Sequence, residues 1–81
     1  MSIKTNYSIT AFDTNGKRIY SEHSRTLAIA HKVARELLAY GNVATVDVDR
    51  DNVLVSVARY VKNNGMAVRI DGNGNVANIR I

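Results

Sequence analysis

The sequence predicts a small α+β domain with a mostly antiparallel sheet and one or two helices on one face of that sheet. Apolar and polar residues alternate near both ends of the chain, which is typical of half-buried strands. A turn segment containing Asn and Gly interrupts each alternating run, which indicates two hairpins. Between the hairpins, apolar residues recur at helical spacing. The length of 81 residues suits a single domain spanning 1–81.

The first hairpin begins with residues 7–12, where apolar and polar side chains alternate. The Asn-Gly pair at 15–16 predicts a tight turn, because both residues tolerate a positive φ. Residues 17–21 then return as the second strand. Because successive strand residues point to opposite faces, we expect Ile19 and Tyr20 on opposite sides of the sheet.

A helix follows the first hairpin. Ser24 or Thr26 is its expected N-cap, since a hydroxyl oxygen can accept a bond from an unpaired amide of the first turn. Gly41 is its expected end, because glycine readily takes the left-handed conformation there. One apolar stripe is expected to pack on the sheet: Leu27, Ala30, Val33, Ala34, Leu37 and Leu38.

Residues 43–48 predict a strand, because β-branched residues dominate them. Residues 52–64 fit two interpretations. A preceding acidic N-cap and the stop signal of Asn64-Gly65 favour a helix, whereas four valines favour a strand. We take the helix as the prediction and keep the strand as its alternative.

The second hairpin consists of residues 66–70 and 76–81 around a turn at 71–75. The predicted order is β-β-α-β-α-β-β. If residues 52–64 form a strand, the order becomes ββα followed by a four-strand meander. The side chains expected to face the helices are those of Val68, Ile70, Ile79 and Ile81.

Composition excludes several classes of function. The chain has no cysteine, which excludes disulfides, thiolate metal sites and cysteine nucleophiles. A secreted domain this small usually carries such cross-links, so we expect a cytoplasmic protein. No apolar run approaches the length of a membrane span, and the N-terminal residues lack the apolar stretch of a signal peptide. We therefore expect no membrane association.

The chemistry-bearing residues predict neither a metal site nor catalysis. His23 and His31 lie eight residues apart, and neither this spacing nor a nearby acid makes them a metal-binding pair. Asp47, Asp49 and Asp51 have the spacing that opens a calcium loop, but the turn glycine and the closing glutamate are both missing. We therefore expect a protein without enzymatic activity, metal or cofactor.

Basic residues are the candidates for binding. Lys and Arg number eleven against seven Asp and Glu, for a net charge of +4, which favours anionic partners. On the open face of the sheet, Arg69 and Arg80 are expected to emerge together, with Arg18 and Tyr20 beside them. Such a face can stack on bases and hold phosphates, or meet an acidic protein surface. The second candidate surface is the outer side of the first helix with its N-terminal flank: Arg25, Lys32 and Arg35.

The first half of the chain carries a resemblance. The segments Tyr7–Ala11, Asn15–Lys17 and Ala30–Leu37, followed by a valine-rich strand, resemble small phage-encoded accessory proteins. In particular, their size and layout are similar to the small α/β anti-CRISPR proteins. The resemblance covers about residues 7–48 and includes no diagnostic motif. Many such decoy proteins are acidic, whereas this chain is basic. The resemblance implies a compact inhibitor that binds a host complex without chemistry.

Three functions follow as hypotheses. The leading one is a phage or mobile-element inhibitor that binds a host nucleoprotein defence complex in the host cytoplasm. The second is a small DNA- or RNA-binding domain that uses the same basic sheet face. The third is a self-associating module, whose edge strand pairs with a copy of itself to form a homodimer.

Overall fold

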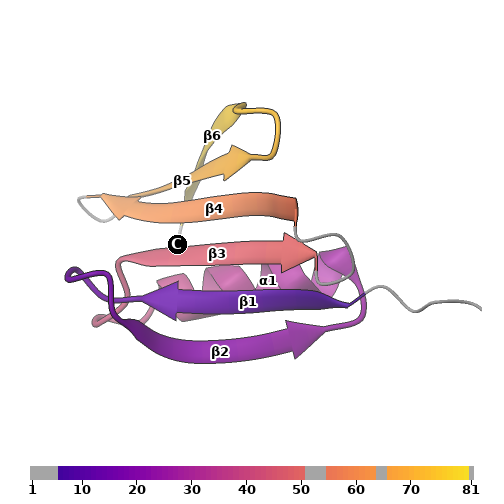
Figure 1. Ribbon diagram of the computed structural model, residues 1–81. Helices are drawn as coiled ribbons and strands as arrows, with labels where there is room; N and C mark the ends of the chain where they lie inside the picture. Colours follow the sequence, from indigo (N-terminus) through magenta and orange to yellow (C-terminus); the bar gives the residue numbers. More distant parts are fainter. Residues whose placement is uncertain (1–5, 51–54, 64–65, 81) are drawn as a thin grey trace, which may run out of the picture.

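One antiparallel sheet and one helix make up the part of the chain that the computed structural model describes, residues 6–50, 55–63 and 66–80. The sheet order is β2-β1-β3-β4-β5-β6, and α1 lies across one face (Figure 1). The fold is α+β but dominated by strands. The elements in chain order are β1 (Tyr7–Phe12), β2 (Arg18–Ser24), α1 (Leu27–Leu38), β3 (Thr45–Arg50), β4 (Val55–Asn63), β5 (Met66–Asp71) and β6 (Val76–Arg80).

The first hairpin closes where the sequence predicts. Gly16 has a φ of 80°, and its N–H donates to the carbonyl of Asp13 at 3.0 Å. The pairing is irregular at one place, because Ala11 pairs with Tyr20 and the next residue, Phe12, pairs with Arg18. Ile19 is therefore an extra residue, and such a bulge re-aims neighbouring side chains.

This bulge overturns one expectation of the sequence. Ile19 packs against the core, and the ring of Tyr20 meets the ring of Tyr40, which follows α1. Both side chains thus lie on the helix side of the sheet, and the expectation of opposite faces was wrong. A bulge cannot be found from strict alternation alone.

The helix begins as predicted and ends differently. Thr26 is the N-cap, and its Oγ1 accepts from the N–H of Ile29 at 3.2 Å. Gly41 is not the left-handed terminator, since Gly16 and Gly74 are the positive-φ glycines of the described residues. Instead, a right-handed Ala39 caps the helix. The following turn bonds close its end without a left-handed residue.

The prediction of a second helix over residues 52–64 was wrong. The described part of this segment is β4, a strand paired with β3 on one side and β5 on the other. Ala58 and Tyr60 are buried on the helix side of the sheet, where they contribute to the core. Pairing on both sides outweighs the cap signals that suggested a helix. The predicted stop at residues 64–65 and the start at 52–54 lie outside the described residues.

The structure therefore has the alternative topology, ββα followed by the meander β3-β4-β5-β6. The helix packs chiefly on β1, β2, β3 and β4, while β5 and β6 extend beyond it (Figure 1). The apolar stripe of α1 faces the core as predicted. Four of its six residues, Ala30, Ala34, Leu37 and Leu38, are buried, and Leu27 and Val33 pack at the margin.

Candidate binding surfaces

The residues that the sequence predicts on one basic face of the sheet lie on two different sides of it. Opposed residues of paired strands point to the same side of the sheet, so Tyr20 shares the helix side with Ala11. Arg18 pairs with Phe12, the residue after Ala11 in β1, and therefore lies on the open side. The prediction that Arg18 and Tyr20 lie on the same side of the sheet was wrong, because the extra residue Ile19 between them changes the alternation.

The orientation of β5 was also predicted wrongly. Arg69 pairs with Tyr60, whose side chain is buried beneath α1, and the neighbouring Ala67 is fully buried. Arg69 therefore lies on the helix side, and Val68 and Ile70 lie on the open side. Alternation favoured the more apolar face of β5 for the core, whereas the register with β4 places Arg69 beside the buried Tyr60 and leaves Val68 and Ile70 on the open side.

In β6, the expected placement of Ile79 on the helix side is confirmed by its pairing with the buried Ala67 and its packing on the core. The backbone of Arg80 pairs with Met66. Arg80 does not adjoin Arg69 across the ladder, since Arg69 pairs with Ala77. The remaining predicted position, Ile81, lies outside the described residues.

Arg69 instead joins a cluster of side chains from three elements. Nδ1 of His31 on α1 lies 2.5 Å from Oη of Tyr60 on β4, and Arg69 also hydrogen-bonds this phenol. A guanidinium only donates, so Oη accepts from Arg69, while the direction of its bond to His31 is set by the tautomer of the imidazole. Arg35, one helical turn beyond His31, acts electrostatically on the same phenol. We call His31, Arg35, Tyr60 and Arg69 the basic cluster.

The basic cluster has distinct protonation properties. Burial, followed by the charge of Arg69, lowers the pKa of His31 below 6.5 and favours the neutral imidazole. Burial raises the pKa of Tyr60, opposed by the hydrogen bond and charge of Arg69 and by Arg35. At neutral pH the cluster therefore carries its positive charge on the two arginines.

The arginines of the basic cluster have little compensation from acidic groups. Among the described residues, no carboxylate lies within 4 Å of the guanidinium of Arg35 or Arg69. Asp71 interacts with Arg69 at longer range, but its Oδ1 accepts the N–H groups of Asn73 and Asn75, both at 2.9 Å. The cluster is therefore suited to an anionic group supplied from outside.

The other predicted binding residues are dispersed. Tyr20 contacts the ring of Tyr40 edge-on and its Oη accepts from Nδ2 of Asn42 at 3.2 Å. Lys32 is exposed on α1. Arg25 is exposed just before α1, beside a small hollow that His23 also lines. Thus Arg35, from the second predicted surface, and Arg69, from the first, are brought together, whereas the others are not.

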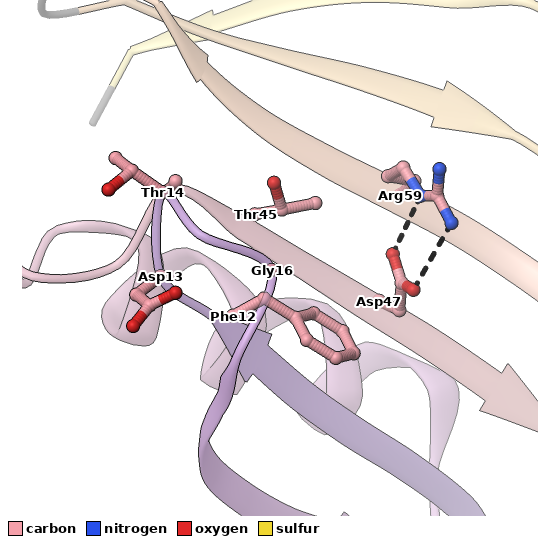
Figure 2. Close-up of a pocket in the computed structure, with 8 residues that line it drawn as sticks. Phe12, Asp13, Thr14, Gly16, Thr45, Asp47 and Arg59 are labelled. Atoms are coloured by element: carbon pink, nitrogen blue, oxygen red, sulfur yellow. Dashed lines mark hydrogen bonds and ion pairs between the residues drawn. The ribbon is translucent and has the colours of Figure 1, made fainter.

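A hollow of about 320 Å³ lies on the open face, beside the turn of the first hairpin (Figure 2). Its charged groups already have partners. Asp47 accepts from Nε and Nη2 of Arg59 at 2.8 and 3.3 Å, and Asp13 Oδ1 accepts the N–H groups of Asn15 and Lys17 at 2.9 Å. The surface of the hollow therefore consists largely of the Phe12 ring and the backbone of the turn, and its charged groups are already paired.

The open face changes character from one end to the other. Near β1 and β3 it carries short polar and acidic side chains such as Thr10 and Asp47. Over β5 and β6 it carries Val68, Ile70 and Val76, and Val76 is 64% exposed. Sequence alternation alone could not identify this division, because it depends on which strands become neighbours.

Metal-ligand clusters and membrane-spanning helices are both absent from the described residues. No group of three or more His, Asp or Glu side chains there could hold a metal ion. No helix in that part of the chain has the length and apolar character to cross a membrane. No family model, curated protein or solved structure matches the chain.

Proposed function

We propose that the protein is a non-catalytic inhibitor that binds an acidic protein surface of a host nucleoprotein complex. The observation that supports this proposal is the basic cluster. Two arginines from separate elements act on one buried phenol, and no carboxylate of the described residues pairs with either. Arginine suits this role because its planar fork of donors matches a carboxylate.

A protein surface is a better partner than nucleic acid for this geometry. Sequence-tolerant binding of single strands needs aromatic rings free to stack on bases. Tyr20 contacts Tyr40, Tyr60 is fully buried, and the open sheet face presents Asp47. The ring within the basic cluster, that of Tyr60, is therefore not available to a base, and the exposed Tyr20 lies on β2, with three strands between it and Arg69 on β5, whereas the two arginines remain suited to carboxylates.

The test measures inhibition directly. Purified CRISPR surveillance complexes of several types are assayed for binding to target DNA, with and without a molar excess of this protein. The wild-type protein is expected to reduce DNA binding by one of them. Arg35→Glu should lower the inhibitory potency at least tenfold, because a reversed charge opposes the acidic partner. Arg18→Glu, an exposed charge reversal on the other face, is the matched control and should retain potency.

A gel-shift titration with free DNA and RNA, at low and physiological salt, separates the alternative. Binding that weakens steeply with salt and is lost in Arg35→Glu would assign the cluster to phosphate contacts. Equal inhibition by the wild type and Arg35→Glu would reject the basic cluster as the binding surface. Absence of inhibition across the panel would reject the inhibitor proposal.

A further inference from the structure

The two edges of the sheet are built differently. In the described part of the chain, β2 and β6 are the outermost strands. The edge strand β2 carries Arg18, Glu22 and His23 and pairs with β1 through a bulge. Charges and bulges are devices by which proteins prevent an edge strand from pairing with another chain.

The edge strand β6 has fewer of these devices. It has no charged residue from Val76 to Ile79, and its five pairs with β5 follow one register without a bulge. Alternate backbone groups of an antiparallel strand point to opposite edges, so about half of those in β6 face away from β5. No strand of the described residues pairs with these outward N–H and C=O groups, so they can bond to a further strand.

We propose that β6 pairs antiparallel with β6 of a second copy, with the two-fold axis at Asn78. This inference is independent of the basic cluster. The symmetry gives both copies the same bonds, as an isologous interface requires. Asn78 is the central residue of β6, so this register pairs all five residues of each strand.

The charges of two copies are compatible in this register. Arg80, the one charged residue of β6, comes opposite the neutral Val76 of the other copy. No like charges therefore face each other, despite the net charge of +4. A two-fold pairing of β2 with β2 of a second copy would centre on Ser21. It would place the Glu22 side chains of the two copies diagonally near each other, and because like charges repel, β2 is the less favourable edge.

Pairing at β6 also continues the apolar layer on the helix side of the sheet. On the helix side, Ala77 comes opposite Ile79 of the other copy, and both side chains are partly buried already. On the open side, Val76 is 64% exposed and Met66 is 53% exposed. In the cross-strand row on this side, Arg80 of the other copy stands between Val76 and the Met66 of the other copy, so the apolar layer is continued on the helix side only. Pairing of five residues is a small interface, so the dimer is expected to depend on protein concentration.

Cysteine cross-linking tests the register. Because the chain has no cysteine, Asn78→Cys introduces one thiol per molecule. At the two-fold axis, the opposed Cα atoms would be about 4.5–5.5 Å apart, within the range of a disulfide. Mild oxidation should convert most of Asn78→Cys to a covalent dimer on a non-reducing gel. Ser21→Cys, the central exposed position of β2, is the matched control and should remain mostly monomeric.

A second pair of variants keeps the test independent of thiol reactivity. Sedimentation equilibrium of the wild type should show a mass that rises from 8.9 kDa towards twice that value with concentration. Asn78→Lys places two like charges opposite each other and should abolish this rise, whereas Ser21→Lys should preserve it. Equal cross-linking of Asn78→Cys and Ser21→Cys, or a wild-type mass of 8.9 kDa at every concentration, would overturn the proposal.

Discussion

The sheet has a covered half and an uncovered end, and the two differ in what stabilises them. Beneath α1, residues such as Ile9, Val46 and Leu38 are fully buried, and burial of apolar surface is the main stabilising contribution there. Beyond α1, the hairpin of β5 and β6 carries partly exposed apolar residues on both faces. An isolated hairpin is marginal in water, so pairing with β4 must hold this end in place. The covered half therefore forms the core, whereas the uncovered end is open to partners.

The largest expected difference between the two regions is in the free energy of unfolding. Ile9→Ala creates a cavity beneath α1 and should lower this free energy by about 2–5 kcal/mol. Ile70→Ala removes the same atoms from the open side of β5 and should lower it by about 1 kcal/mol. Urea denaturation followed by circular dichroism measures both values. Comparable losses would mean that Ile70 is covered in solution, as another chain on the open face would cause.

The next effect concerns the phenol in the basic cluster. Tyr60→Phe removes the hydroxyl that His31 and Arg69 share, and a hydrogen bond of this kind contributes about 0.5–1.5 kcal/mol. Tyr20→Phe is the matched control, because its hydroxyl accepts from Asn42 at the exposed edge. We expect the control to change the free energy of unfolding by less than about 0.5 kcal/mol. Identical losses in the two variants would show that the cluster does not fix β5 to α1.

The sequence predicted the covered half better than the uncovered end, for physical reasons. The stripe of α1 and the alternation of β1 each have one clearly apolar face, so burial admits one orientation. In β5, alternation favours Met66, Val68 and Ile70 for the core over Ala67, Arg69 and Asp71, but the structure buries Ala67. The buried Ala67 and the ladder partner Tyr60 decide the orientation, and both depend on long-range pairing.

The sequence predicted only part of the candidate site, because the site too depends on long-range strand pairing. Arg35 and Arg69 are both predicted binding residues, but the sequence assigns them to different surfaces. Their convergence on Tyr60 follows from β4 being a strand, since the predicted helix would not have placed Tyr60 beside Arg69. His31 has no sequence signal for this role, because a lone histidine on a helix is not a binding pattern.

A smaller effect is the response of the cluster to acid. The pKa of His31 is lowered in the folded protein by burial and by Arg69, so the folded state binds this proton less readily than the unfolded chain. The free energy of unfolding should therefore decrease as the pH falls below 6.5, down to the lowered folded pKa. His31→Gln should flatten the profile below pH 6.5, and His23→Gln, which changes a histidine outside the basic cluster, is the matched control. Urea titrations at each pH provide the measurement, and an unchanged slope in His31→Gln would contradict the assignment.

The smallest effect is expected where the polar and apolar parts of the open face meet. Asp47 and Arg59 form a two-bond pair there, adjacent to Ile70 in the cross-strand row, and the Arg59 side chain is 59% exposed (Figure 2). The bond to Asp47 is the main cause of the raised pKa of Arg59. Water screens such an exposed pair, so a double-mutant cycle of Asp47→Ala and Arg59→Ala should give a coupling of about 0.2–1 kcal/mol that decreases in high salt. A coupling well above this range, unaffected by salt, would show that the pair is shielded from water. Since the hollow beside it is open in the monomer, such shielding would require a second chain on the open face.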